Sequence, residues 1–356
     1  MRFGIFFFPT LGPEDRPAAE YYDDCLALAE RADAANFATL KTVEHYLGAY
    51  GGYSPDPVAF LAAASQRTSR IRLVTGAVIP AFHHPLQLAS RLAMLDNLCH
   101  GRLDAGFGRG FLPQEFAAFG VPMDQSQERF VRGVEAVRSL WTGEEVVLRE
   151  TSHPGGPMYA LPRPVQVPHP PIWVAVTRTP GSFIWAGHHG YFLMTVPHVA
   201  TRQETQNLFR SYRQAWCRAG HEPGSERIQI SYQCLVSEDG KTARALARGH
   251  FEDYGHKLAD AVALWAHTRS TDYPGYERLA VALAANTFDR ALANATVLVG
   301  NPEEVVSQLQ QVCRWYGDVE LSLQVNFGTL PLEVASHTLD LLVSEVMPRL
   351  GQAQDR

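Results

Sequence analysis

The sequence of 356 residues is poor in lysine and has no excess of positive charge. Only Lys41, Lys241 and Lys257 of its 31 basic residues are lysines, and 37 acidic residues leave a formal net charge of -6. This balance disfavours nucleic acid or an anionic membrane surface as the main partner. A small organic molecule is the default partner. Any bound phosphate should be held by arginine, whose planar fork suits phosphate oxygens.

Cysteines and long apolar runs are also scarce. The five cysteines never form a Cys-x-x-Cys pair, which disfavours a disulfide framework and a zinc site, and the paired histidines at 83–84 and 188–189 lack a third ligand at a useful spacing. No stretch approaches the ~18 uninterrupted apolar residues of a membrane span, and residues 1–9 lack the cleavage pattern of a signal peptide. We therefore expect a cytoplasmic protein with no metal site.

Apolar runs of strand length alternate with helical periodicity along most of the chain, and 46% hydrophobic residues suffice for a sizeable core. Strands are predicted at 2–8, 39–43, 71–79, 102–106, 172–176, 191–196, 228–236 and 319–325. Helices are predicted at 18–35, 57–66, 85–98, 128–141, 180–187, 203–219, 302–315 and 331–346. The continuous apolar strands are typical of a parallel sheet covered on both faces. The first half fits a closed barrel or an open sheet, and the full count favours an α/β fold, the (β/α)8 TIM barrel.

Two stretches interrupt this alternation. Residues 143–160 combine glycine, proline and a Glu-Glu-Val-Val-Leu-Arg run, which predicts an inserted hairpin. Residues 242–296 are too helical for a linker, so they should hold the seventh helix and a helical insertion over the barrel mouth. Because no repeat or clear linker is present, we expect a single domain over residues 1–356.

Arg109 lies among glycines at the predicted end of the fourth strand. Gly106, Gly108 and Gly110 are only a weak dinucleotide-binding signal, because the third glycine that opens a crossover helix is missing. What remains is a strand end with exposed N–H groups around an arginine, which favours an anion site. A tight turn with a surface arginine is the alternative.

Glu44 and His45 follow the second strand, where barrel enzymes place catalytic side chains. A histidine beside a glutamate can act as an acid or base near neutral pH, and a structural histidine is the alternative. Gly76 and Ala77 end the third strand, where small residues would let a flat cofactor approach the backbone, or simply pack. Residues 177–179 are a second candidate phosphate contact, since Thr177, Arg178 and Thr179 precede a predicted helix start.

These features together resemble the bacterial luciferase-like family of flavin-dependent monooxygenases over nearly the whole chain. The segments that carry the resemblance are MRFGIFFFPT at 1–10, TVEHY at 42–46, the run from SPDPVAF to FGRGF at 54–111, FGVPMDQSQERF at 119–130, PPIWVAVTRTPGSF at 170–183 and NFGTLP at 326–331.

The resemblance implies a barrel that binds FMN at its carboxyl-end mouth. By position, His45 would support the reaction of reduced flavin with oxygen, and Arg109 would grip the phosphate. A non-proline cis peptide between Gly76 and Ala77 would lie under the flavin ring. Further cofactor contacts are implied at Glu44, Phe111, Leu112, Val174, Ala175, Val176 and Thr177.

Two departures from the family pattern affect these expectations. Luciferases carry an arginine after the serine that starts the fourth helix, whereas Ser126 is followed here by Gln127, which leaves Arg129 as the nearest substitute. A looser phosphate grip suits a cofactor that arrives reduced and leaves oxidised. The luciferase cysteine before the phosphate arginine is Gly108, so light emission is not expected.

The leading hypothesis is an FMNH2-dependent two-component monooxygenase. A separate flavin reductase would supply FMNH2, O2 would add to give a flavin peroxide, and one oxygen atom would enter a small organic substrate. The lack of a convincing NAD(P)H fingerprint motivates the separate reductase. A deazaflavin-dependent hydride-transfer enzyme and a non-catalytic flavin-binding relative are the alternatives.

The positions of apolar residues in the sequence give expectations for the kind of substrate and for the oligomeric state. Strand-end residues that would give a largely apolar cavity, suited to an aldehyde, ketone or aromatic metabolite, are Phe6, Phe8, Phe82, Thr195, Val196, Gln233 and Asn326. The helices at 57–66 and 85–98 carry more apolar residues than one buried stripe requires, which predicts a homodimer. The residues concerned are Ala59, Ala62, Ala63, Leu88, Leu92, Met94 and Leu95.

Overall fold

The computed structural model describes residues 1–143 and 160–351, and its centre is a closed barrel of parallel strands. The strands are β1 (Arg2–Phe7), β2 (Thr39–Thr42), β3 (Arg72–Thr75), β4 (Leu103–Phe107), β5 (Ile172–Ala175), β6 (Phe192–Thr195), β7 (Ile228–Val236), β8 (Leu298–Gly300) and β9 (Glu320–Gln324). Neighbours pair in order from β1 to β7, and β9 pairs with both β7 and β1. Eight strands therefore close the barrel, which confirms the predicted TIM barrel.

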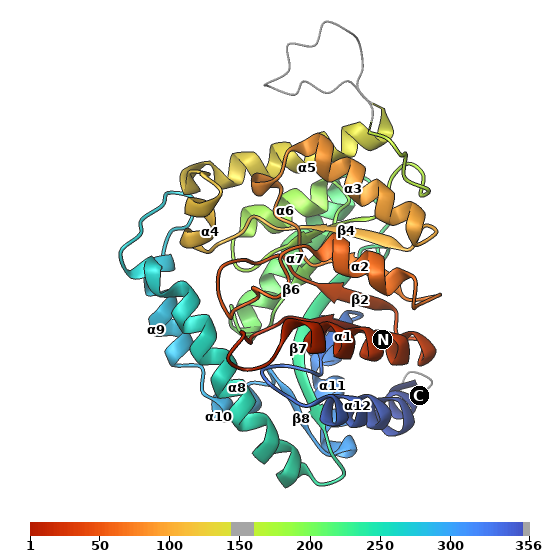
Figure 1. The fold of residues 1–356 in the computed structure, drawn as a ribbon, viewed down its shortest axis with the longest axis vertical. Helices are drawn as coiled ribbons and strands as arrows, with labels where there is room; N and C mark the ends of the chain where they lie inside the picture. Colours follow the sequence, from red (N-terminus) through yellow and green to blue (C-terminus); the bar gives the residue numbers. More distant parts are fainter. Residues whose placement is uncertain (144–159, 352–356) are drawn as a thin grey trace, which may run out of the picture.

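Helices surround the barrel, as Figure 1 shows. They are α1 (Ala18–Ala34), α2 (Pro57–Ser65), α3 (Pro85–Leu98), α4 (Pro113–Ala118), α5 (Ser126–Thr142), α6 (Pro180–His188), α7 (Arg202–Arg218), α8 (Gly240–Val262), α9 (Leu279–Ala284), α10 (Phe288–Ala293), α11 (Pro302–Tyr316), α12 (Leu332–Leu341) and α13 (Met347–Gly351). Proline begins several of them, because its fixed φ suits the first helical position. Helices α7 and α11 begin with capping boxes at Thr201 and Asn301.

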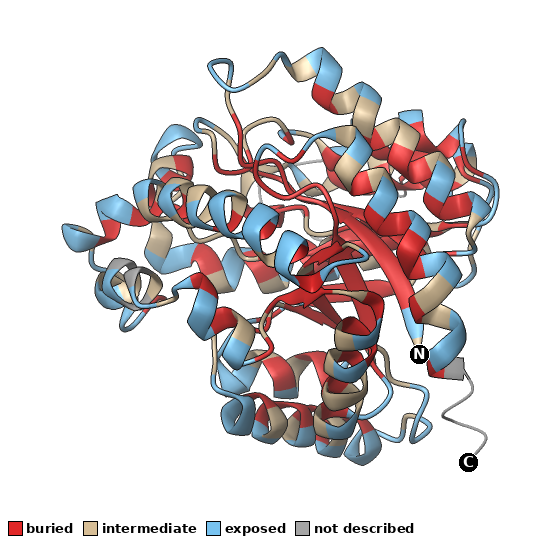
Figure 2. Ribbon diagram, turned by 90° about the horizontal axis from the view of Figure 1, so that it is seen from below, coloured by how far each residue is buried: buried red, intermediate tan, exposed pale blue. Residues whose placement is uncertain are grey.

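The core lies between the strands and the helices that cover them. All residues of β2, β4 and β9 are buried, since one side of each strand faces the barrel interior and the other faces the helices. Figure 2 shows this pattern, with buried strands enclosed by helices whose outer faces are exposed. This double burial explains the continuous apolar sequences of β5 and β6, whereas β7 and β9 carry polar residues at alternate positions.

The structure adds two elements that the sequence analysis missed. Strand β8 is three residues long and, among the described residues, pairs only with the end of β7, at Cys234–Val236. It is too short to give a periodic signal. Helix α4 has six residues and follows directly after the glycine-rich end of β4. Six residues are too few to show the apolar periodicity by which a helix is recognised in a sequence.

The stretch 242–296 contains most of α8, all of α9 and all of α10, and it covers the barrel mouth. Leu258, Val262 and Trp265 belong to the same buried cluster as Phe8 and Leu112. The Trp265 side chain also donates a hydrogen bond to the Phe111 carbonyl at 2.9 Å. Figure 1 shows α8 running along one side of the molecule with α9 next to it. The hairpin predicted at 143–160 falls almost entirely outside the described residues.

Apolar residues on α2 and α3 divide between the core of the chain and its surface. Leu88, Leu92 and Leu95 are buried in the main core cluster, so they are not available to a second copy. Ala59, Ala63 and Met94 are exposed. The apolar surface left for dimerisation is therefore narrower than the sequence suggests. In the described residues, none of the helices has the length and apolar character needed to cross a membrane.

Candidate functional site

The ends of β3, β4 and β5 form a floor of small residues at the barrel mouth. A Cβ atom added to Gly108 would lie 3.2 Å from the Ala77 Cβ and 3.7 Å from the Ala175 Cβ, so the three residues are adjacent. Ala175 is exposed. The Gly76–Ala77 peptide bond is cis, which confirms the expectation drawn from the resemblance. We call Ala77, Gly108 and Ala175 the small-residue floor, and a flat ring can lie on it closely.

Gly76 is required by a neighbour that the sequence analysis did not single out. A Cβ at this position would lie 2.2 Å from Lys41 Cγ and 2.3 Å from Lys41 Cδ. The lysine stem therefore passes over the backbone of Gly76 inside the barrel. A charged residue in the middle of the buried strand TLKT was the signal that could have found Lys41.

His45 lies at the mouth, near the end of β2, and is 7% exposed. Its ring is in contact with Phe8, Tyr50 and Phe111, with centroids 5.5, 5.4 and 5.9 Å away. Its Nδ1 lies 3.1 Å from Oε1 of Glu115 on α4. This aromatic surrounding keeps water away from the imidazole and leaves Glu115 as its polar partner.

Glu115 orients the imidazole of His45. This carboxylate is fully buried, and its Oε1 also accepts the backbone N–H of Tyr46 at 2.7 Å. A carboxylate oxygen accepts hydrogen bonds, so this contact fits a proton on Nδ1 of His45 and leaves Nε2 without a printed partner among the described residues. Glu115 was missed by sequence reasoning, because it lies 70 residues further along the chain, on a helix that the pattern did not predict.

Glu44 does not lie beside the His45 ring, so that part of the sequence interpretation is wrong. Both residues come after Thr42, the last residue of β2, and their side chains take different partners. Glu44 accepts hydrogen bonds from the Ile79 N–H and from His83 Nε2, both at 2.8 Å, and from the Tyr46 hydroxyl at 2.7 Å. Glu44 therefore ties the end of β2 to the segment after the cis peptide, and its contact with a cofactor stays a prediction.

Arg109 reaches the start of α5 and the insertion. It donates to Gln127 Oε1 at 3.0 Å and to the Asp272 carbonyl at 2.9 Å, and its guanidinium lies 4.1 Å from the centre of the Tyr273 ring. The Asp272 carboxylate accepts the Ser126 hydroxyl and the Gln127 N–H, both at 2.9 Å. A chain carboxylate therefore already lies where the helix N-terminus and Arg109 would attract an anion.

The remaining sequence candidates lie further from this anion position. Arg129 is exposed and donates to Gln125 at 3.1 Å, so Gln127 is the α5 residue that contacts Arg109. Thr177 and Thr179 are exposed, and exposed Arg178 pairs with Glu204 at 3.4 Å. The second candidate phosphate contact therefore lies on the surface at the start of α6.

Of the hydrophobic candidates, Leu112 and Phe111 belong to the mouth, whereas Val174 faces the outer core. Leu112 is 1% exposed and is clustered with Phe8 and Leu258. Val174 is buried among the residues between strands and helices, so its side chain does not reach the small-residue floor. Only its neighbour Ala175 offers surface there.

The other half of the mouth holds a cavity of about 60 Å³ beneath α8. Among its lining residues are Phe6, Val196, Ser231, Gln233, Tyr254 and Leu258. Phe6, Val196 and Gln233 were expected in the mouth from the sequence. Asn326 was also expected there, but its amide instead donates to Cys25 Sγ at 3.4 Å beneath α1. The mouth thus has a small-residue half over β3–β5 and an enclosed half over β7, β9 and β1.

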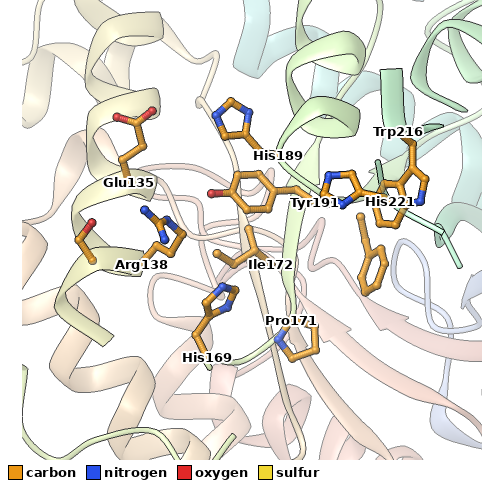
Figure 3. Close-up of a pocket in the computed structure, with 12 residues that line it drawn as sticks. Glu135, Arg138, His169, Pro171, Ile172, His189, Tyr191, Trp216 and His221 are labelled. Carbon is orange, nitrogen blue, oxygen red and sulfur yellow. The ribbon is translucent and has the colours of Figure 1, made fainter. Parts of the chain in front are cut away.

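A larger pocket of about 670 Å³ lies at the opposite end of the barrel. Figure 3 shows its residues, which include His169 before β5, His189 and Tyr191 before β6, and Trp216 at the end of α7. These residues precede the strands, and active sites of TIM barrels lie at the other end. In the described part of the chain, no group of three or more His, Cys, Asp or Glu side chains could hold a metal ion.

Comparisons with known proteins agree with this geometry. A family described as Luciferase-like monooxygenase matches residues 1–318. The oxygenase component of flavin-dependent trigonelline monooxygenase from Acinetobacter baylyi is 26% identical, covering 99% of this chain and 97% of that protein. The crystal structure of monooxygenase RslO1 from Streptomyces bottropensis is 46% identical with a TM-score of 0.87, covering 98% of this chain and 99% of that one. The oxygenating constituent of 3,6-diketocamphane monooxygenase from Pseudomonas putida, solved with FMN, shares the fold, with 20% identity, a TM-score of 0.79 and coverage of 98% and 99%.

Proposed function

Because this chain belongs to the luciferase-like monooxygenase family, we propose that it is the oxygenase of a two-component system that uses reduced FMN and O2 to insert one oxygen atom into a small organic substrate. The observation that carries this proposal is the small-residue floor beside an anion position. Together they match the two parts of FMN, a flat ring and a phosphate.

The donor set fits a phosphate. The Ser126 hydroxyl and the Gln127 N–H already hold the Asp272 carboxylate, and Arg109 lies alongside with a guanidinium that can turn from the Asp272 carbonyl to phosphate oxygens. These three groups would hold the phosphate of FMN, and the Asp272 carboxylate would leave as it binds. Arg129 and the 177–179 segment would come second, because they lie on the surface.

The floor fits the flavin ring. The small-residue floor has no side-chain atom beyond Cβ. Phe111 follows Gly108 closely in the sequence, and its ring packs against the ring of His45. Reduced FMN would supply the electrons that activate O2, and O2 would supply the oxygen atom that enters the substrate. The protein excludes water with the aromatic side chains around His45 and with the insertion packed over the mouth.

His45 is the proton-handling group in this proposal. Glu115 holds the proton on Nδ1, so Nε2 can accept one proton from a reacting oxygen and return it later. The buried Glu115 then faces an imidazolium and stabilises it. The His45 side chain is 9% exposed, so this proton does not exchange freely with bulk water.

Reduced FMN would come from a separate flavin reductase. To test the whole proposal, the purified protein is mixed with reduced FMN and a panel of ketones, aldehydes and phenols under heavy-isotope O2, and products are analysed by mass spectrometry. One heavy oxygen atom per product molecule is expected. Rapid NADH oxidation by the protein and FMN alone would contradict the two-component assignment.

Two controls separate the alternatives. Reduced deazaflavin in place of reduced FMN should neither bind tightly nor give product, and turnover with it would favour a hydride-transfer enzyme. Tight FMN binding without oxygen incorporation into any substrate would favour a non-catalytic binding protein. We also propose a homodimer through α2 and α3, and a monomeric mass in light scattering at micromolar concentration would contradict it.

A further inference from the structure

Lys41 crosses the barrel interior from β2 to β7. Its Nζ donates to Ser231 Oγ at 2.6 Å and lies 4.4 Å from the centre of the Phe6 ring. Ser231 and Phe6 both line the enclosed cavity in the mouth. The lysine side chain is 2% exposed and fits only because Gly76 lacks a Cβ. Its amine therefore lies directly beneath the cavity, one hydrogen bond away.

The surrounding charges are engaged elsewhere. Titratable side chains on the elements around Lys41 and its cavity include Arg2 on β1, Glu320 on β9, Asp104 on β4, Arg72 on β3, Tyr232 and Cys234 on β7, and Tyr254 on α8. Arg227 lies directly before β7, His45 lies beyond the end of β2, and His198 follows β6 and lines the cavity. Glu320 pairs with Arg227 at 2.9 Å, and Asp104 pairs with Arg72 at 2.8 Å. Within the described residues, no carboxylate lies within 4.0 Å of the Lys41 Nζ. Burial lowers the pKa of Lys41 to about 7, because the attraction of Glu320 offsets only part of the desolvation.

The cavity above this amine suits an aromatic ring. Phe6, Phe251, Tyr254 and Leu258 contribute apolar walls. The polar lining residues His198, Gln233, Asn286 and Gln324 carry no charge near neutral pH, since burial lowers the pKa of His198 to about 4. Its present volume of about 60 Å³ is smaller than the ~300–1,000 Å³ of typical ligand sites, so a ring-sized ligand enters only if the outer wall on α8 moves. A ligand that carried a charge through these walls would lose its hydration without compensation. A neutral ligand with an acidic hydroxyl avoids that cost and still offers a proton to the amine.

We propose that this cavity binds a phenolic or enolic substrate through its acidic hydroxyl, which gives up its proton through Ser231 to Lys41. This inference rests on the proposed function, since the ionised ring or enol is the molecule that would receive the oxygen atom. The substrate O–H bond breaks, its proton passes to Ser231 Oγ, and the hydroxyl proton of Ser231 passes to Nζ. The neutral amine of Lys41 becomes an ammonium, and the neutral substrate becomes an oxyanion that accepts a hydrogen bond from Ser231. The net charge is therefore unchanged. No oxidation accompanies this step.

The scarcity of lysine makes the proton on Lys41 directly observable. Lysine labelled with a heavy carbon isotope at Cε gives three NMR signals, one each for Lys41, Lys241 and Lys257. Lys41→Met assigns the Lys41 signal. Lys257 is an internal reference, because although burial lowers its pKa, the hydrogen bonds to Asp15 and Asp253 raise it above the ordinary lysine value. The flavin-free protein is titrated with pH, alone and with para-nitrophenol.

In the free protein the Lys41 signal should titrate near neutral pH. Saturating para-nitrophenol should raise its apparent pKa by at least about one unit, which equals the coupling expected from a contacting opposite charge. The same ligand should become ionised at lower pH when bound, seen as its visible phenolate absorbance. Para-nitroanisole, which has no acidic proton, should leave the Lys41 titration unchanged. Ser231→Ala should reduce both shifts while the Lys257 signal stays the same.

Three outcomes would overturn the proposal. In the first, para-nitrophenol does not bind saturably. In the second, it binds without moving the Lys41 titration. In the third, its ionisation is the same in the wild type and in Lys41→Met, which preserves the stem but removes the amine. No flavin is present, so these results do not depend on oxygenation. Loss of oxygen incorporation with an intact Lys41 response would contradict only the proposed function.

Discussion

The two ends of the barrel interior treat buried charge in opposite ways. At the amino-terminal end, Glu320 accepts hydrogen bonds from Arg227 at 2.9 Å and from Gln229 at 2.7 Å, and Asp104 accepts two from Arg72 at 3.0 and 2.8 Å. At the carboxyl-terminal end, Lys41 has one hydrogen bond, to Ser231, among the described residues. The buried charges at the amino-terminal end are paired within the chain. At the carboxyl-terminal end, the amine of Lys41 can form further hydrogen bonds to a ligand.

This difference separates stability from function. Although burial alone would raise the pKa of Glu320, Arg227 and the hydrogen bonds from Thr39 and Gln229 hold it below its ordinary value. A paired network of this kind fixes the geometry of the strands that it joins. At the other end, the single hydrogen bond of Lys41 among the described residues is the kind of incomplete pairing that is typical of functional sites. Variants at the two ends should therefore fail in different assays.

The largest effect is expected from Glu320→Ala at the amino-terminal end. The substitution leaves Arg227 buried without its main partner, so the free energy of unfolding should fall by about 3–5 kcal/mol. Chemical denaturation followed by circular dichroism measures this. The matched control is Asp289→Ala, which removes the partner of Arg248 at a site where the Asp289 side chain is 74% exposed. That loss should be much smaller than the loss from Glu320→Ala, because exposed ion pairs contribute little to stability, and equal losses would contradict the comparison.

Lys41→Met should stabilise the protein, with a marked pH dependence. The folded-state pKa of about 7 lies below the ordinary lysine value of 10.5, so the unfolded state binds more protons between these two pH values. Wild-type stability should therefore rise with pH across this window. At pH values below the window Lys41→Met should be more stable than the wild type by a few kcal/mol, and the gap should close as the pH approaches the upper limit. A gap that does not change with pH would show that Lys41 is protonated to the same extent in both states.

His45→Ala should lower turnover by roughly a hundredfold, the usual range for losing one acid-base group. Binding of reduced FMN should stay within about tenfold, because the ring lies against the small-residue floor and not on this histidine. His45→Gln keeps hydrogen bonding but cannot transfer a proton, so it should be as slow as the alanine variant. Oxygen transfer at the wild-type rate in His45→Ala would make His45 a structural residue.

Arg109→Ala should weaken reduced FMN binding by roughly 2–3 kcal/mol, because a charge-assisted contact to phosphate is lost. Reduced riboflavin, which has no phosphate, should be affected far less. Arg129→Ala is the matched control, since this arginine is exposed and bonds to Gln125. Its effect on FMN binding should be within a few tenths of a kcal/mol. Equal losses for FMN and riboflavin would show that Arg109 acts on the fold or the ring.

The barrel could be predicted from the sequence because strand-length segments alternate with helical periodicity along the chain, although β2 and β9 are themselves not purely apolar. The site was only partly predictable. Position at a strand end pointed to His45 and Arg109, because parallel strands bring their carboxyl ends together. The partners of these residues, Glu115 and Asp272, lie on short or inserted segments far along the chain, and no local pattern records such a contact. Glu44 was paired with His45 because the two are adjacent in the sequence, but in the structure His45 contacts Glu115 and Glu44 contacts His83.

Asp272 gives the phosphate position a counter-ion before any ligand arrives. Binding of FMN would therefore exchange one anion for another. The net charge around Ser126, Gln127 and Arg109 would change less than at a positively charged site that holds no anion before the ligand binds. FMN affinity should consequently depend only weakly on ionic strength, since fewer solution ions are released or taken up. Under the proposed function, the same carboxylate would return as the oxidised cofactor leaves, which would shorten the residence time of the oxidised flavin. A site that always holds an anion would therefore favour the exchange of cofactor with a reductase that the proposal requires in every turnover.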